Sequence, residues 1–315
     1  MSSIGDDAVS GTAAAFERAR ARGYWASVGS RILRQPAALV ALVLLVALFT
    51  VGGLAHEIAP EGWNSIDLSS RWSNHAPTFA GDHFLGTDNI GRDVLVRTIW
   101  GLHDTESVAL IGSAVATVIG LLVGGIAGYR RGWTDLLLMR LVDLVTAFPV
   151  IVLMLAVFTL LEPVTTTEAT VVFALSMWTF VARVVRARFI QLGHEEFVEA
   201  ARALGASDLR IAARHLLPNA AGTLVVAATS MIGQIMLVEA TVEFFGFGVN
   251  SLVRPTLGNL SADAAVSGIG HFNALGLGWW VWATPAAVLV LVLLCVNIVG
   301  DGLDRAFDPR SSAGR

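Results

Sequence analysis

The sequence contains no lysine, and all 21 of its basic residues are arginine. A nucleotide-binding loop of the G-x-x-x-x-G-K-[ST] type is therefore excluded, because its lysine reaches the β- and γ-phosphates. The sequence also lacks a His-Glu-x-x-His zinc motif and a Gly-x-Ser-x-Gly nucleophile turn. These absences predict a chain that is not itself an enzyme and that binds no cofactor directly.

Charged residues and cysteine are also scarce. Only 15% of the residues are charged, whereas 55% are hydrophobic. A soluble domain needs more charge than this on its surface, so the composition indicates a membrane protein. The single cysteine, Cys295, lies in an apolar run and cannot form an internal disulfide. We interpret it as a small buried hydrophobic residue.

Six apolar stretches are long enough to cross a bilayer core ~30 Å thick. The third and fifth contain ionisable residues. Together the six stretches predict an all-α polytopic membrane protein. They are Pro36–Ala55, Val108–Tyr129, Leu136–Leu161, Ala169–Val185, Ala220–Gly246 and Trp279–Val299.

Arginine placement predicts the orientation of these spans. With the N-terminus in the cytoplasm, 17 of the 21 arginines lie on the inner side. Only Arg71, Arg92, Arg97 and Arg254 then lie outside. The positive-inside rule favours this orientation, and we therefore expect both termini in the cytoplasm.

The spans divide the chain into four parts. We expect a cytoplasmic N-terminal tail over 1–30, then a first span with an outer segment over 31–107. A five-helix core follows over 108–300 and contains a cytoplasmic loop over 186–219. A cytoplasmic C-terminal tail occupies 301–315.

The cytoplasmic loop predicts two short helices joined by a sharp bend. Good helix formers fill Glu199–Leu204, and Gly205 can end that helix in a left-handed conformation. Ser207 or Asp208 can cap the next helix, which should end before Pro218. An ordinary amphipathic loop is the simplest alternative. A nucleic-acid-reading helix-turn-helix is disfavoured, because the loop is tethered to a membrane and has few base-reading residues.

The residues of this loop resemble the EAA loop of ABC-importer permeases. The match consists of Glu199-Ala200-Ala201, then Gly205, then His215-Leu216-Leu217-Pro218. In that family the loop docks into a groove on the ATPase subunit. The resemblance implies a type I permease fold of the MetI kind, with the first span added at the periphery. It also implies an ATPase-coupling role for Glu199, Ala200, Ala201, Gly205, His215, Leu217 and Pro218.

Two further motifs resemble the second (C-type) permease subunit of dipeptide and oligopeptide importers. The first motif lies near the C-terminus and consists of Gly300-Asp301-Gly302-Leu303 and Asp308-Pro309-Arg310, which resembles the closing motif of that subunit. The resemblance covers about residues 30–310. We interpret Arg92 as a local structural ion-pair partner of the flanking aspartates. The second motif lies in the outer segment and consists of Leu85, Gly86, Thr87, Asp88, Gly91, Arg92 and Asp93.

The resemblance implies a set of partners. These are a second homologous permease subunit, two ATP-binding subunits that hold ATP and Mg, and an extracytoplasmic substrate-binding protein. The location implied is the bacterial cytoplasmic (inner) membrane. Peptide is the expected cargo, and oligosaccharide, nickel or another small solute stays open as an alternative. An ion-coupled secondary transporter is the rival from another class.

Asp104, Glu106 and Glu243 depart from the family pattern by adding acidic residues near the outer mouth. Glu239 and Glu243 lie near the outer end of the fifth span. They either line the translocation path, where they would favour a cationic group, or extend to the outer surface.

The third span also contains charged residues. Arg140 and Asp143 share a helix face and either line a cavity or lie at the interface. Pro149 should kink this span.

Small residues recur every fourth position in the second span, at Gly112, Ala116, Gly120, Gly124 and Gly128. They predict close packing against another helix, most simply within this subunit. The outer histidines form no compact metal-ligand motif, so no metal site is expected. Those histidines are His56, His75, His83, His103 and His271. Trp279, Trp280 and Trp282 resemble an interfacial aromatic belt.

Overall fold

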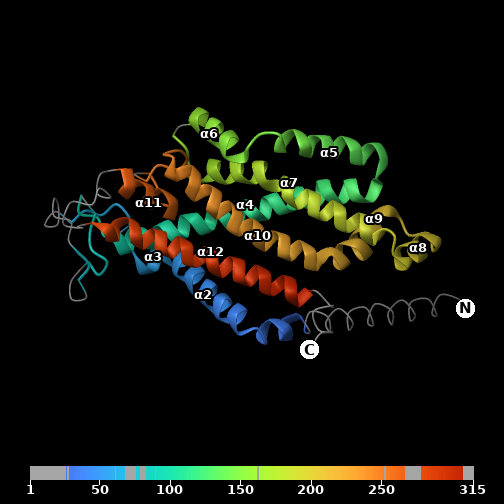
Figure 1. Cartoon of the computed structure of the whole chain (residues 1–315), viewed down its shortest axis with the longest axis horizontal. Coiled ribbons are helices and arrows are strands. Elements are labelled where there is room, and N and C mark those ends of the chain that lie inside the picture. The colour runs from blue at the N-terminus through green and yellow to red at the C-terminus, as the bar shows by residue number, and fades with distance from the viewer. Residues whose placement is uncertain are drawn as a thin grey trace, which may run out of the picture.

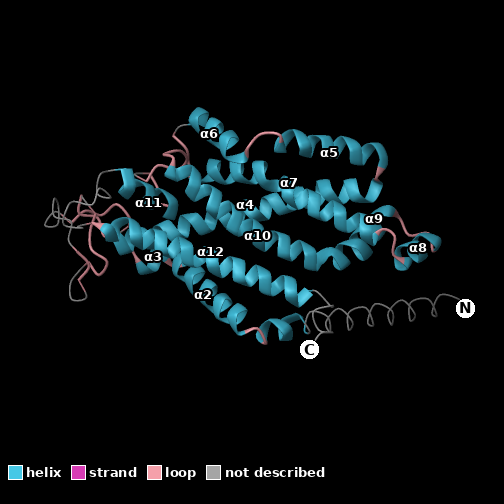
Figure 2. Ribbon diagram, in the orientation of Figure 1, coloured by secondary structure: helices cyan, strands magenta, loops and turns pink. Residues whose placement is uncertain are grey.

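The computed structural model describes residues 26, 28–60, 62–67, 76–78, 83–88, 90–161, 163–251, 253–266 and 278–307. This part of the chain is a helical bundle in which extended pairing is limited to two isolated bridges (Figures 1 and 2). Helical turns over 28–33 precede the first named helix. The helices are α2 (Pro36–Gly53), α3 (Ala55–Ile58), α4 (Val94–Arg130), α5 (Gly132–Thr146), α6 (Val150–Leu161), α7 (Thr166–Leu192), α8 (Glu196–Ala203), α9 (Asp208–Ile211), a π-helical turn (Ala212–Leu216), α10 (Leu217–Phe244), α11 (Leu257–Val266) and α12 (Trp279–Phe307).

Five helices are long and apolar enough to cross a membrane, and the expected total of six is reached when the bent pair α5 and α6 is taken as one broken span. The two halves of that span meet at 73°, directly before Pro149 and Val150. The kink predicted at Pro149 is therefore confirmed, because its ring cannot continue the preceding helix. Figure 1 shows α8 and α9 at one end of the bundle and α3 and α11 at the other.

Several helices extend beyond their predicted ends. The outer segment was expected to continue to Ser107, but α4 already begins at Val94. Its first turns contain buried Arg97, Asp104 and Glu106, whose charges face protein instead of water. Because these turns are polar, hydropathy did not predict this part of the helix. Similarly, α12 continues to Phe307, through the start of the expected C-terminal tail.

The small-residue stripe of α4 packs within the subunit, against α7. A Cβ added to Gly124 would lie 2.2 Å from the carbonyl oxygen of Ala182, and one added to Gly120 would lie 2.8 Å from that of Trp178. The two helices run in the same direction with their backbones in contact. The prediction of intrasubunit packing is confirmed, and glycine is required wherever the α7 backbone fills the space.

α2 lies at the edge of the bundle, against α12 and α4 (Figure 1). Arg31 Nη1 donates to the Ala306 carbonyl oxygen (3.1 Å), and the Gln35 amide donates to that of Gly302 (3.4 Å). Only 17% of α2 is buried, less than in the apolar stretches of the other four long helices. The first span is thus peripheral, as expected.

The remaining helices frame the two ends of the bundle. α10 lies against α4, α7 and α12, and α11 crosses between α10 and α12 at one end. The α8 end projects beyond α2 and α12, as Figure 1 shows. Two candidate sites follow from this arrangement, one at each end.

Candidate functional site

The loop that joins α7 to α10 folds into a bent helical hairpin, formed by α8, α9 and the π-helical turn. α8 ends in a Schellman motif, in which Ala206 N–H donates to the Ala201 carbonyl and Gly205 N–H to the Arg202 carbonyl (3.0 and 2.9 Å). Gly205 has φ +79°, a conformation that side-chain-bearing residues rarely adopt. The predicted bend at Gly205 is confirmed.

One face of the hairpin is anchored to the bundle and the other is open. Val198 and Ile211 are fully buried, and they hold α8 and α9 against the helical core. By contrast, Leu204 is 88% exposed and Leu209 is 79% exposed on either side of the bend. Exposed leucines at a helical corner form an apolar surface that fits a partner protein better than water. We call Leu204 and Leu209 the leucine corner.

The hairpin continues into α10 without a break, which corrects one expectation. The second short helix was expected to end before Pro218, but Pro218 lies in the first turn of α10. The π-helical turn Ala212–Leu216 lies directly before it. A wider turn there relieves the clash between the proline ring and the carbonyl four residues earlier. α9, the turn and α10 therefore form one lever from the hairpin into the membrane.

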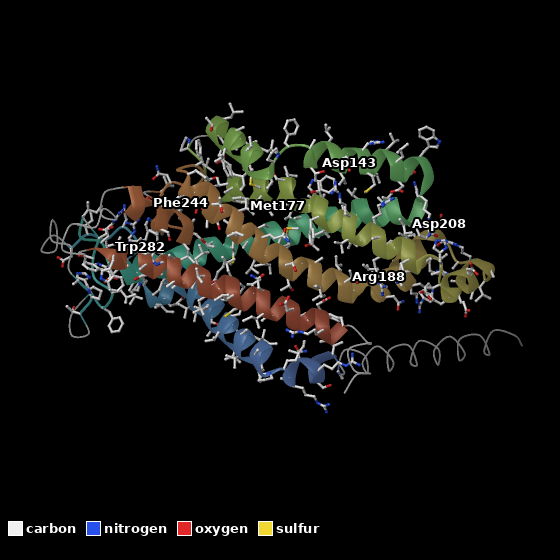
Figure 3. All side chains as sticks on the ribbon, viewed as in Figure 1. Asp143, Met177, Arg188, Asp208, Phe244 and Trp282 are labelled. Carbon is white, nitrogen blue, oxygen red and sulfur yellow. The ribbon has the colours of Figure 1, made fainter. Side chains whose placement is uncertain are left out.

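Contacts to α4 and α7 fix the hairpin, and the sequence did not reveal them. Tyr129 Oη donates to Asp208 Oδ1 (2.6 Å), and the Arg202 guanidinium lies 5.9 Å from the centre of the Tyr129 ring. Asp208 thus accepts from Tyr129, and the capping position belongs to Ser207, whose side chain makes no cap hydrogen bond. Arg188 of α7 donates to the Asn219 carbonyl (3.4 Å). Figure 3 shows Arg188 and Asp208 towards the α8 end.

The residues predicted to couple to an ATPase lie along the hairpin. Glu199 and Ala200 are exposed on α8, while Ala201 is buried against the core. His215 is half-buried, with its ring 6.5 Å from that of Phe197. Leu217 and Pro218 begin α10. The structure therefore brings all seven predicted residues into one projecting element.

At the opposite end, residues 85–88 and 90–93 of the outer motif fold compactly at the start of α4. We call these residues the clasp. Gly86 and Gly91 have φ +79° and +87°, as turn residues should. Asp88 accepts from Arg92 Nε and Arg97 Nη1, both at 2.7 Å. The ion pair expected for Arg92 is present with Asp88. Arg97 as a second partner was not foreseen, because its helix was not.

Electrostatics keeps the Asp88 carboxylate ionised. Burial opposes the charged form most strongly, but Arg92 and Arg97 outweigh it and lower the pKa of Asp88 below its ordinary value. Asp88 Oδ1 also accepts from the backbone N–H groups of Ile90 and Arg92. A buried carboxylate with this many donors is a structural centre of the clasp.

The clasp is tied to helices that are distant in sequence. Trp280 Nε1 donates to the Thr87 carbonyl oxygen (3.2 Å), so Trp280 is buried and is not part of an interfacial belt. Trp279 and Trp282 are exposed and fit the expected belt. The clasp and the start of α12 are thereby held together.

Two acidic side chains of this region share His83. Asp93 caps α4 by accepting from Val96 N–H, and its other oxygen lies 2.8 Å from His83 Nδ1. His83 Nε2 lies 3.2 Å from Asp67. Burial opposes protonation, but the hydrogen bonds to Asp93 and Asp67 outweigh it and raise the pKa of His83 above its ordinary value. Among the described residues, no group of three histidine, cysteine or acidic side chains is placed to hold a metal ion.

Both glutamates predicted for the translocation path are buried inside this subunit. Glu239 is 1% exposed and Glu243 4% exposed, so neither extends to the surface in this conformation. Arg140 and Asp143 instead lie exposed on α5, 3.8 Å apart, and Asp143 also accepts from Arg183 of α7 (3.1 Å). The four predicted path residues thus form an open pair and a closed pair.

Comparison with known proteins agrees with this architecture. The family described as "binding-protein-dependent transport system inner membrane component" matches residues 120–313. A Brucella abortus protein named as a peptide permease is 36% identical over 291 residues, covering 92% of each chain. The oligopeptide transport system permease protein OppC of Mycobacterium tuberculosis is 32% identical over 290 residues, covering 90% of this chain and 94% of its own.

Two solved structures share the fold. Both are inward facing conformations of the MetNI methionine ABC transporter. Their TM-scores are 0.52 and 0.54, at 24% and 21% identity. Each similarity covers 68% of this chain and 96% or 97% of the other.

Proposed function

Because the chain belongs to the family of binding-protein-dependent transport system inner membrane components, we propose that it forms half of the transmembrane path of an ATP-driven peptide importer. The chain is a multi-pass permease subunit of the ABC importer type. Peptide as cargo is supported by relatives that are named peptide or oligopeptide permeases. The complete transporter would contain a second permease subunit, two ATPases that hold ATP and Mg, and an extracytoplasmic binding protein.

The observation that carries this proposal is the anchored hairpin with its leucine corner. Its buried face makes it rigid, and its exposed face presents Leu204 and Leu209 to a partner. ATP-driven closure of the ATPases would move this face. The continuous lever through α9 and α10 would pass the motion into the membrane. The α8 end then faces the cytoplasm, as the distribution of arginines favours.

The path residues fit two stages of such a cycle. Arg140 and Asp143 are exposed on α5 and are available to a second subunit or to cargo. Glu239 and Glu243 are closed off, so cargo would reach them only after the α11 end opens. A cationic group, such as a peptide amino end, suits carboxylates that become accessible in this way.

Reconstitution of the transporter in liposomes tests the coupling role. We expect the double variant Leu204→Glu and Leu209→Glu to stay folded but to lose ATPase co-purification and ATP-dependent peptide uptake at least tenfold. The matched variant Leu204→Met and Leu209→Met keeps the apolar surface and should retain both. Full uptake by the glutamate variant, or uptake by this chain without ATPases, would contradict the proposal.

A further inference from the structure

Three carboxyl side chains from two helices meet near the α11 end of the bundle. Glu239 and Glu243 come from α10 and Asp104 from α4, and all three are at least 96% buried. Glu239 lies close enough to Asp104 and Glu243 for both of their charges to act on its carboxyl group. We call these three residues the acidic cluster.

The three carboxyl groups have unequal partners. Arg254 Nη1 donates to Asp104 (3.4 Å), and the Thr256 hydroxyl donates to Glu243 (2.5 Å). Within the described part of the chain, neither oxygen of Glu239 has a hydrogen bond of good geometry. The Thr105 hydroxyl is the one donor close to Glu239, and its geometry falls short of a good hydrogen bond. Three acids therefore share few donors, and the most deeply buried acid has the weakest partner.

The helices around the cluster add little further compensation. α12 has no acidic or basic residue between Trp279 and Gly300, and Glu168 of α7 is exposed in its own capping box. Glu106, also on α4, is buried against Gly52 of α2. Arg254 is the permanently charged cation at the cluster, and His103 of α4 and His56 of α3 also lie close enough to act on Asp104 electrostatically.

Residues 254–258, which lead into α11, cover the cluster. Leu257 N–H donates to Thr105 Oγ1 (3.1 Å). A Cβ on Gly258 would lie 2.6 Å from the Ala240 Cα and 2.4 Å from a Glu243 oxygen. Backbone therefore lies directly on α10 at Ala240, and Glu239 is 1% exposed while this segment is in place.

We propose that Glu239 is a proton-binding site, which holds a proton while residues 254–258 cover the acidic cluster and releases it when they lift. An ionised carboxylate without a hydrogen bond of good geometry, next to two other carboxylates, is strongly disfavoured in a dry site. A bound metal is the alternative means of neutralisation, but the described residues place no three ligands for one. A proton satisfies the same electrostatic need without a ligand cage.

The proton site stands on this geometry, whereas its link to opening of the α11 end rests on the proposed transport function. Opening would expose Glu239 to water, where the ionised form is stable. If opening releases one proton, each unit rise of pH on the α11 side increases the ratio of open to closed transporter by up to about tenfold.

Infrared spectroscopy on the complete transporter, reconstituted in lipid at neutral pH, tests the proton directly. Protonated carboxylic acids have a carbonyl stretch that ionised carboxylates lack. We expect this band in the wild type and a clear drop of its intensity in Glu239→Gln, which keeps the shape of the neutral side chain. A band of equal intensity in both proteins would overturn the proposal.

Control variants assign the band. Glu106 and Asp104 are also buried acids with an unpartnered oxygen in the described chain, so Glu239→Gln must also remove intensity in Glu106→Gln and Asp104→Asn backgrounds. Exposed Glu57→Gln should leave the band unchanged. If Glu239→Gln does not assemble, Glu239→Asp keeps the acid and must shift the band in frequency. An unshifted band would overturn the assignment.

A separate measurement tests the link to opening. In the wild type, ATP-driven uptake should depend on the pH of the α11 side, and Glu239→Gln should flatten that dependence. An infrared change without any change in pH dependence would retain the proton site and remove its coupling to transport. Failure of the transporter function itself would leave the infrared result unaffected, so the two failures are distinguishable.

Discussion

The two ends of the bundle differ in which side chains they bury: one buries charged side chains, and the other leaves leucines exposed. At the α11 end, Asp88, Arg92 and Arg97 are buried and form ion pairs within the chain. At the α8 end, the corresponding polar contacts are exposed, and Leu204 and Leu209 lie in solvent. One end therefore encloses its charged side chains within this chain, whereas the other presents an apolar surface that fits a partner. The difference separates residues that stabilise the subunit from residues that serve the complex.

The largest expected effect tests the clasp of the α11 end. Asp88→Ala leaves two arginines buried without their carboxylate, and we expect a loss of about 3–5 kcal/mol in the free energy of unfolding. Asp208→Ala, at the α8 end, removes an exposed partner and should cost less than about 1 kcal/mol. Thermal unfolding in detergent measures both. Equal losses would erase the contrast between the ends.

Gly205 tests whether the α8 end depends on backbone conformation. A Cβ there meets open space, so a substitution is disfavoured only by the φ of +79°. We expect Gly205→Val to lose about 1–2 kcal/mol in stability of the hairpin. Gly205→Asn should lose little, because asparagine tolerates this region. Hydrogen exchange of the hairpin amides reports the difference, and identical protection in the two variants would contradict the assignment.

A smaller effect is expected from the contact between the hairpin and α4. Tyr129→Phe removes the hydroxyl that donates to Asp208 but keeps the ring beneath Arg202. The loss should be about 0.5–1 kcal/mol, typical of a single hydrogen bond. Peptide uptake per ATP hydrolysed should fall, whereas ATPase assembly should persist. A parallel fall of assembly and uptake would instead indicate a merely structural contact.

The smallest effect is a dependence on pH at the α11 end. The raised pKa of His83 means that its stabilisation is fully present below the ordinary value of about 6.5 and is lost as pH rises through the raised value. The lowered pKa of Asp88 acts oppositely: its stabilisation is present above about 3.9 and is lost as pH falls through the lowered value. His83→Gln should remove the decline on the alkaline side. His194→Gln, an exposed histidine of the α8 end, should leave that decline in place.

Sequence patterns were informative where one physical cause dominates. Apolar length revealed the spans, Pro149 the break between α5 and α6, and Gly205 the bend of the hairpin. They failed where tertiary contacts override the local signal. The first turns of α4 are polar yet buried, because Arg97 pairs with Asp88 and Asp104 with Arg254.

Contacts between residues that are far apart in the chain could not be predicted from the sequence either. Nothing near Tyr129 indicates Asp208, and nothing near Trp280 indicates Thr87. The acidic cluster combines Asp104 and Glu239, which lie on different helices and whose burial no periodicity reveals. Such contacts arise only when α4, α10 and α12 are already packed.

The seat of α2 has a consequence for how the protein is made. Gln35 and Arg31 bond to the backbone at Gly302 and Ala306, close to the end of the last helix. α2 therefore finds these acceptors only after α12 has been synthesised. Until then α2 can pack against α4 but lacks both hydrogen bonds, and a nascent chain stalled before Gly300 would never form them.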